Sequence, residues 1–265
     1  NVAYLLSQHK LRAAVFEKEN DVSMGTTRAN SAIVHAGYDP EPGTAMARLN
    51  VRGSALTKEQ CAAFDVKYRQ IGSLVLAFSD EEMATVRRLY ENGVANGVPG
   101  VRVLTREETL AMEPNLSDAV CGALYAPSAA IVEPWDLALA LAEAAVENGV
   151  ELHLETAVTG AEKISGGWRL HTAKGDFEAR AVVNAAGVEA DLVAAMAGEP
   201  GFTTIPSRGE YYLLDKSQGY VVNHVVFQCP NRDGKGVLVS PTVHYNLIVG
   251  PNAEPSGRED VSTQA

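Results

Sequence analysis

Residues 14–37, AVFEKENDVSMGTTRANSAIVHAG, most constrain what this chain can fold into. The stretch begins with a short apolar run, 13–16, of the kind that forms a buried parallel strand, and Glu17 follows at its end. A turn-rich segment comes next, and a second apolar run then carries His35 into Ala36-Gly37. In a dinucleotide-binding fold, an acidic residue at the tip of the second strand binds the adenosine ribose hydroxyls. The stretch therefore predicts part of a nucleotide site.

Small residues in two places extend this prediction to a flavin-adenine cofactor. The hydroxyl residues Thr26, Thr27 and Ser31 can donate hydrogen bonds to phosphate oxygens. A later apolar run, 181–184, is expected to form a buried strand that ends in Ala185-Ala186-Gly187, where small residues let the backbone approach a flat cofactor closely. The alternatives are an ordinary surface glutamate at position 17 and a tight strand-to-helix turn after 184.

The glycine-rich turn that cradles the pyrophosphate should lie roughly 20 residues before the acidic residue. Glu17 is too close to the start of the chain for that turn to fit. Residues 1–8 have the pattern of the tail of a helix, with no capping residue ahead of them, and the chain does not begin with Met. We therefore expect a truncated chain whose GxGxxG turn lies upstream.

Composition excludes several classes of protein. The formal net charge of −11 comes without a basic stripe, so we expect no binding to nucleic acid. The three cysteines are scattered and no histidines are spaced as helix ligands, so we expect neither a disulfide framework nor a metal site. No apolar run is long enough to cross a bilayer and no signal peptide is visible. These features predict a cytoplasmic protein, or one held peripherally at the membrane.

The order of elements predicts an α/β fold with β-rich insertions. Alternating helices and strands suit a Rossmann-like FAD-binding domain, and the later strands suit an antiparallel, β-rich α+β substrate domain interleaved with it. We assign 1–65 and 131–200 to the first domain, and 66–130 and 201–265 to the second. The expected helices are 45–64 after Thr44, one after Ser79, one after Thr105, one from Pro134 to Gly149, and 189–196. The expected later strands are 66–70, 73–77, 121–125, 130–132, 150–154, 210–214, 221–228, 236–240 and 245–249, together with two strands that follow hairpin turns, 168–172 after the turn at 166–167 and 177–181 after the turn at 174–176.

His35 is the candidate catalytic base. It follows three apolar residues and precedes Ala-Gly, so access to its ring is open. A neutral imidazole beside an oxidisable carbon can take a hydroxyl proton as hydride leaves. A core histidine bonded to backbone is the alternative. The remaining histidines have no comparable context: His9, His153, His171, His224 and His244.

Two cations are candidates for holding an anionic substrate. Lys235 stands between glycines before an apolar strand, where it can point into a cleft as a point charge. A hairpin turn with a solvated lysine is the alternative. Arg208 begins another strand and can steer an anion or pair with the neighbours of Glu210.

Six segments carry a resemblance to a known family: FEKE, GTTRANSAIVHAG, GALYAPSAAIVEPWDLALALAEAAVENGVEL, VVNAAG, RGEYYLLD and GKGVLVSPTVHYN. They resemble the flavin-dependent glycerol-3-phosphate dehydrogenases and oxidases of the D-amino-acid-oxidase-like superfamily. L-2-hydroxyglutarate oxidases share the NSxxxHAG and RGEYY elements. The chain departs from the family in lacking the GxGxxG strand-turn and the C-terminal strand and helix, and in carrying Tyr245 where the family usually has glycine.

The resemblance implies roles for particular residues toward FAD and substrate. His35 would be the base on the substrate hydroxyl, and Lys235, with Ser31, would bind the anion. The implied FAD contacts are Glu17 and Lys18 at the ribose, Thr26 and Thr27 at the diphosphate, Ser31, Ala32 and Ile33 beside the flavin ring, Val158 at the adenine through its backbone, and Ala186 and Gly187 close to the dinucleotide.

The resemblance implies oxidation of a small anionic secondary alcohol, sn-glycerol 3-phosphate, to dihydroxyacetone phosphate. L-2-hydroxyglutarate or another 2-hydroxy acid is an alternative substrate. A third hypothesis is an inactive fragment that does not retain flavin, because the pyrophosphate turn is the main anion anchor of such sites. The electron acceptor, oxygen or a quinone-linked partner, and the oligomeric state stay open.

Overall fold

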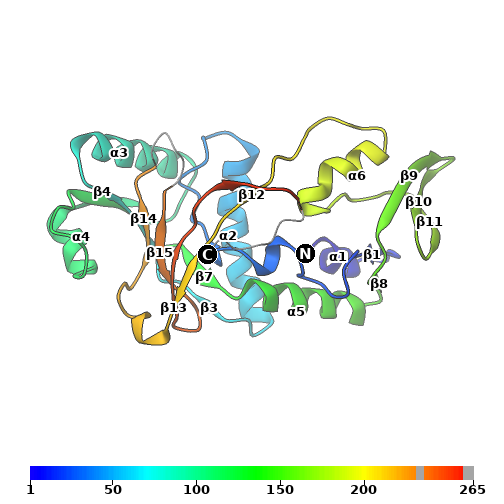
Figure 1. The fold of residues 1–265 in the computed structure, drawn as a ribbon, viewed down its shortest axis with the longest axis horizontal. Helices are drawn as coiled ribbons and strands as arrows, with labels where there is room; N and C mark the ends of the chain where they lie inside the picture. Colours follow the sequence, from blue (N-terminus) through cyan, green and yellow to red (C-terminus); the bar gives the residue numbers. More distant parts are fainter. Residues whose placement is uncertain (231–235, 259–265) are drawn as a thin grey trace. The chain divides into compact units, whose positions relative to one another are not determined.

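The computed structural model describes residues 1–230 and 236–258 of the chain (Figure 1). The chain forms two compact units, each built from separated segments. Unit 1 contains Asn1–Asn30, Pro134–Arg208 and the chain from Glu254, and unit 2 contains Ser31–Glu133 and Gly209–Ala253. The predicted assignment of 1–65 and 131–200 to FAD, and of 66–130 and 201–265 to substrate, stays a prediction.

Unit 1 combines helices with short strands. Its β1 pairs in parallel with β8, with Val15 opposite Leu152, as the apolar run 13–16 predicts. The strands β9, β10 and β11 form an antiparallel sheet with turns at Gly166 and Gly175, both at positive φ, so the two predicted hairpins are confirmed. The elements of unit 1 are α1 (Val2–Ser7), β1 (Ala14–Phe16), η1 (Thr26–Arg28), α5 (Pro134–Glu147), β8 (Glu151–His153), β9 (Val158–Ile164), β10 (Gly167–Thr172), β11 (Gly175–Ala179), η2 (Gly187–Glu189), α6 (Ala190–Met196), β12 (Ser207–Arg208) and β17 (Glu254–Pro255).

The prediction of a buried strand at 181–184 is wrong. These residues form no strand and lie exposed, with 40% of Val182 and 62% of Val183 accessible to solvent. A strand is held by a ladder of hydrogen bonds to a neighbour, and apolar composition alone does not supply that neighbour. No strand of the described residues pairs with this segment.

Unit 2 is built on a seven-stranded sheet in the order β13-β16-β15-β14-β4-β6-β5, with a separate three-stranded sheet β2-β7-β3. All neighbours in the larger sheet are antiparallel except β14 and β4, so the expected β-rich, largely antiparallel character is confirmed. The elements of unit 2 are β2 (Ile33–Val34), α2 (Ala45–Ala63), β3 (Tyr68–Arg69), β4 (Ser73–Ala77), α3 (Asp80–Ala95), β5 (Arg102–Thr105), α4 (Arg106–Met112), β6 (Gly122–Ala126), β7 (Ala130–Val132), β13 (Tyr212–Leu214), η3 (Lys216–Gln218), β14 (Val225–Gln228), β15 (Leu238–Pro241) and β16 (Leu247–Gly250).

The core of unit 2 lies on both faces of this sheet. Every residue of β4 is buried, because alternate side chains pack on opposite sides. Val75 packs in one cluster with Val86 of α3, whereas Leu74 packs in another with Leu110 of α4. The predicted helix starts are also confirmed, since Thr44, Ser79 and Thr105 each accept a bond from a backbone N–H in the first turn, and Thr105 forms a capping box with Glu108. No helix in the described part of the chain is long and apolar enough to span a membrane.

Candidate functional site

The candidate nucleotide-binding residues of unit 1 gather at the end of β1. The backbone of Glu17 donates to the carbonyl of His153 at 2.9 Å and accepts from the N–H of Thr156 at 2.8 Å. Its carboxylate accepts from the N–H of Glu19 at 2.9 Å, which fixes the loop after the strand. Glu17 therefore lies beside the segment that leads to Val158, two residues after Thr156.

A second contact joins this loop to the Ala186-Gly187 turn. The ammonium of Lys18 lies 2.9 Å from a carboxylate oxygen of Glu189, the last residue of η2. Gly187 has a φ of +57°, and a Cβ placed there would meet nothing within 4 Å, so the turn is open to an approaching molecule. The structure thus brings Glu17, Lys18, Ala186 and Gly187 into one part of unit 1.

The predicted diphosphate contacts lie on an exposed turn. Thr26 and Thr27 are exposed in η1, and the side chain of Asn30 holds this turn by donating to both of their carbonyls, at 3.1 and 2.7 Å. Among the described residues, no hydrogen bond links either threonine with Glu17. Both hydroxyls are therefore accessible, and their role at a diphosphate stays a prediction.

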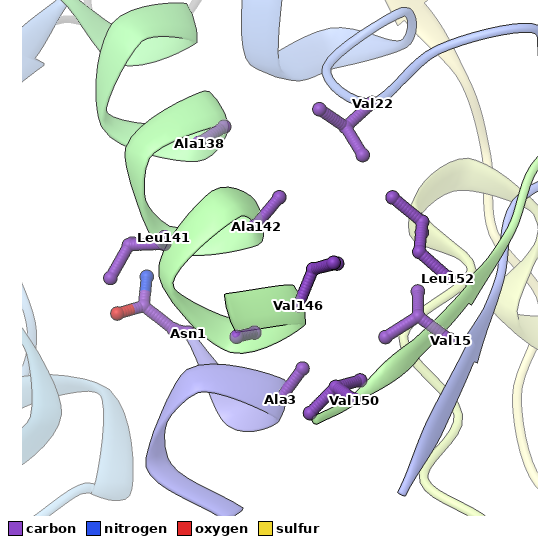
Figure 2. Close-up of a pocket in the computed structure, with 11 residues that line it drawn as sticks. Asn1, Ala3, Val15, Val22, Ala138, Leu141, Ala142, Val146, Val150 and Leu152 are labelled. Atoms are coloured by element: carbon purple, nitrogen blue, oxygen red, sulfur yellow. The ribbon is translucent and has the colours of Figure 1, made fainter. Parts of the chain in front are cut away.

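Unit 1 also contains a small apolar hollow of about 140 Å³ (Figure 2). Ala138, Ala142 and Val146 of α5 face Val15 and Leu152 across it. Apart from Asn1, the lining side chains are hydrocarbon and carry neither a charge nor a proton-transfer group.

A bidentate ion pair fixes the start of α6 in unit 1. Arg258 donates to both carboxylate oxygens of Asp191, at 2.8 and 2.6 Å, and also to the carbonyl of Val188. The Arg258 guanidinium, helped by the N–H of Thr204, lowers the pKa of Asp191 to about 2. This pair therefore ties the segment after β17 to the residues that follow Gly187.

In unit 2, Ser31 and Ala32 form a constrained corner ahead of β2. The hydroxyl of Ser31 lies 2.6 Å from the hydroxyl of Tyr211. Ala32 has a φ of +58°, which is unusual for a residue with a side chain, and its carbonyl accepts from the N–H of Val132 at 3.0 Å. Ile33 then pairs with Ile131. The three residues expected beside the flavin ring are thus held on one rigid turn.

His35 lies exposed at the end of β2. One face of its imidazole stacks against Phe227, with ring centroids 5.7 Å apart and an angle of 27° between the planes. The turn that follows is fixed, because Gly37 has a φ of +106° and its carbonyl accepts from the side chain of Asn96 at 3.0 Å. The alternative of a core histidine does not hold, and the imidazole is accessible to a reactant.

The predicted anion-binding residues are only partly described. Arg208 is half-buried in β12 of unit 1. The strand β12 pairs with β17, and Arg208 lies opposite Glu254 in this pairing. Lys235 lies outside the described residues. Ser31 is half-buried in unit 2.

Two buried carboxylate–histidine pairs in unit 2 were not predicted. Glu113 is fully buried and accepts from the backbone N–H of His224 at 2.7 Å, with Nδ1 of the same histidine 2.6 Å away. Glu133 is also buried, and one oxygen lies 2.7 Å from Nε2 of His244 while the other lies 3.5 Å from the ammonium of Lys67. The partners in each pair stand 111 residues apart, so no local spacing could reveal them.

The family comparison decides how these features are read. The family described as "FAD dependent oxidoreductase" (DAO) matches residues 1–265. The chain belongs to this family. The sequence resemblance and the expectation of an FAD cofactor are therefore confirmed at the level of the family.

Relatives of the chain are named for different substrates. The chain is 50% identical to "Glycerol 3-phosphate dehydrogenase" of Caloramator mitchellensis, over 96% of this chain and 53% of that protein. It is 32% identical to "L-2-hydroxyglutarate dehydrogenase" of Escherichia coli, over 91% of this chain and 58% of that protein. The chain thus spans little more than half the length of these relatives.

The fold agrees with this assignment. An FAD-bound, dithionite-reduced L-alpha-glycerophosphate oxidase from Mycoplasma pneumoniae matches with a TM-score of 0.89 at 30% identity. The match covers 97% of this chain and 69% of the oxidase. The predicted mixed α/β fold of a flavoprotein is confirmed.

Proposed function

We propose that the protein acts in FAD-dependent oxidation of sn-glycerol 3-phosphate to dihydroxyacetone phosphate. The observation that carries this proposal is the exposed imidazole of His35 on a fixed turn, in a chain half identical to a protein named glycerol 3-phosphate dehydrogenase. An accessible imidazole is suited to removing a hydroxyl proton.

The residues of unit 1 fit the adenosine diphosphate part of FAD. The open turn at Gly187 and the open position of Gly25, where a Cβ would also meet nothing within 4 Å, leave the backbone accessible to a bulky anion. Lys18 places a cation beside the same turn through its bond to Glu189. In this proposal the ribose is held by Glu17 and Lys18, the diphosphate by Thr26 and Thr27, the adenine by the backbone of Val158, and the dinucleotide backbone by Ala186 and Gly187.

In unit 2, we propose that His35 contacts the reacting alcohol. Ser31, Ala32 and Ile33 would lie beside the flavin ring. When bound, FAD supplies the acceptor for the hydride of the alcohol carbon. His35 takes the hydroxyl proton, so that a ketone remains after loss of one hydride and one proton. The stacking of its ring on Phe227 restricts the directions in which the imidazole can point. The final electron acceptor in this proposal would be oxygen or a quinone-linked partner.

The substrate charge needs cationic and hydrogen-bonding partners. The proposal assigns Lys235 and Arg208 to the phosphate as cations, and Ser31 as a hydroxyl donor. Ser31 is the best supported of these, because it stands four residues before His35, with only Ala32 and β2 between them.

The test of the catalytic role is His35→Gln in the purified protein saturated with FAD. We expect the rate of flavin reduction by glycerol 3-phosphate to fall about 10²- to 10⁴-fold, because the alcohol loses its base. His9→Gln, at an exposed histidine of unit 1 that has no role in this proposal, should leave the rate unchanged. A His35→Gln rate near that of the wild type, with a normal flavin spectrum, would exclude His35 as the base.

L-2-hydroxyglutarate is the second candidate substrate, supported by the Escherichia coli relative. Both substrates are anionic secondary alcohols, so the same base and the same cations can serve either. Flavin reduction measured side by side with the two compounds separates them. The preferred substrate is the one with the higher kcat/KM.

A further inference from the structure

Hydrogen bonds on both sides of Tyr211 hold its backbone in unit 2. The residue before it, Glu210, exchanges three hydrogen bonds with Asn252: its N–H donates to Oδ1 at 2.7 Å, its carbonyl accepts at 3.2 Å, and its carboxylate accepts at 3.0 Å. The residue after it, Tyr212, pairs with Val249 in the sheet. The backbone of Tyr211 is therefore held on both sides.

The ring of Tyr211 is held as well. It lies so close to Gly250 that a Cβ at that glycine would come within 3.0 Å of the Tyr211 ring and within 2.6 Å of the Glu210 carbonyl. Glycine at 250, with a φ of +143°, thus makes room for the ring. In this position the Tyr211 hydroxyl lies 2.6 Å from the hydroxyl of Ser31.

We propose that Tyr211 is a positioning residue that orients the Ser31 hydroxyl as a donor to the anionic group of the substrate. This inference rests on the proposed function. A serine hydroxyl has one proton to donate and two lone pairs that accept. When Tyr211 donates to Ser31 Oγ, the proton of Ser31 is left for the anion. An anion beside Ser31 selects this direction, and each bond in such a chain strengthens the next.

The backbone next to Ser31 is also fixed. Ser31 precedes Ala32, whose left-handed backbone is retained through the bond from Val132 to its carbonyl. The backbone of this turn is thus fixed from β7, and its one polar side chain at Ser31 is fixed by Tyr211. Without the Tyr211 hydroxyl, the backbone of Ser31 would keep its position, but the Ser31 hydroxyl would no longer be oriented.

The experiment compares Tyr211→Phe with Tyr212→Phe in the FAD-saturated protein. Both changes remove one hydroxyl, but Tyr212 is 78% exposed and serves as the matched control. For Tyr211→Phe we expect the KM for glycerol 3-phosphate to rise about five- to tenfold with kcat changed less than about twofold, because binding in the ground state and the transition state weakens equally. The Tyr212→Phe variant should have wild-type constants.

A double-mutant cycle separates positioning from a general structural effect. If Tyr211 acts through Ser31, Ser31→Ala combined with Tyr211→Phe should raise KM no more than Ser31→Ala alone. The same cycle is measured on the dissociation constant of inorganic phosphate by calorimetry, which does not depend on turnover. Additive effects, or an unchanged KM and phosphate affinity in Tyr211→Phe, would overturn the inference.

The two proposals fail differently. If glycerol 3-phosphate does not reduce the wild-type flavin, the proposed function is wrong, and the phosphate cycle still decides the role of Tyr211. If glycerol 3-phosphate reduces the flavin but Tyr211→Phe matches Tyr212→Phe, only the role of Tyr211 is wrong. Wild-type protein that binds no phosphate and is not reduced overturns both.

Discussion

Tyr245 has a backbone conformation that favours glycine. Its φ of +68° is left-handed, a conformation that costs a residue with a side chain about 1–2 kcal/mol relative to the right-handed form and costs glycine little. A glycine here, which the family resemblance of the sequence implies, would adopt this conformation at little cost. The ring of Tyr245 makes contacts in return, lying 4.9 Å from the Arg69 guanidinium and 6.1 Å from the ring of Tyr220.

Two variants of Tyr245 separate the cost of the left-handed backbone from the contribution of the ring contacts. Tyr245→Ala and Tyr245→Gly both lose the ring contacts, but only alanine keeps the left-handed strain. We expect the glycine variant to be more stable than the alanine variant by about 1 kcal/mol, measured as the free energy of unfolding in urea. Equal stabilities, or a more stable alanine variant, would mean that the backbone at this position is not left-handed in solution.

At the residue scale, sequence reasoning could propose candidate site residues where they lie within one short stretch. The residues from Glu17 to His35 could be singled out because strand, turn and strand follow one another along the chain. The Glu133–His244 and Glu113–His224 pairs could not, because each joins residues brought together only by the tertiary fold. The same is true of Ser31 and Tyr211, which stand 180 positions apart.

At the scale of elements, local signals predicted most helices and hairpins. Capping residues mark where α2, α3 and α4 begin, and glycines at positive φ mark the turns of the β9-β10-β11 sheet. The apolar segment 181–184 was misjudged, because a buried strand depends on a neighbouring strand that sequence composition does not reveal. Predicted strand ends also differ by a few residues, as in β14, which begins at Val225 rather than 221.

The Asp191–Arg258 pair makes the stability of α6 depend on pH. Because Arg258 lowers the pKa of Asp191 to about 2, below its value of about 4 in an unfolded chain, the pair stabilises the folded state fully above about pH 4. This contribution is lost as the pH falls from about 4 through about 2. We expect the difference in unfolding free energy between wild type and Asp191→Asn to shrink over that range.

The partner variant provides the control for this prediction. Arg258→Gln should lose most of the pH-dependent contribution that Asp191→Asn loses, because Arg258 is the largest cause of the lowered pKa, while the N–H of Thr204 still bonds the Asp191 carboxylate. Urea unfolding followed at several pH values between 5 and 2 measures all three proteins. If the wild type stays more stable than both variants by the same free energy down to pH 2, the lowered pKa of Asp191 is contradicted.

At the scale of the whole molecule, the chain is a two-unit member of the FAD-dependent oxidoreductase family, and its candidate residues are divided between the units. Unit 1 contains the residues proposed for the adenosine diphosphate, and unit 2 contains His35, Ser31 and Tyr211. Composition and periodicity predict the α/β class, but the choice between two anionic substrates rests on a few side chains. Relatives of this chain carry both substrate names.

The absorbance spectrum of the FAD-saturated protein, recorded without oxygen before and after glycerol 3-phosphate, tests the central claim most directly. We expect an oxidised flavin spectrum that bleaches on addition of glycerol 3-phosphate, faster than with L-2-hydroxyglutarate at equal concentration, and that bleaches far more slowly in His35→Gln. A protein that takes up no flavin, or a bound flavin that stays oxidised with glycerol 3-phosphate, would contradict the claim.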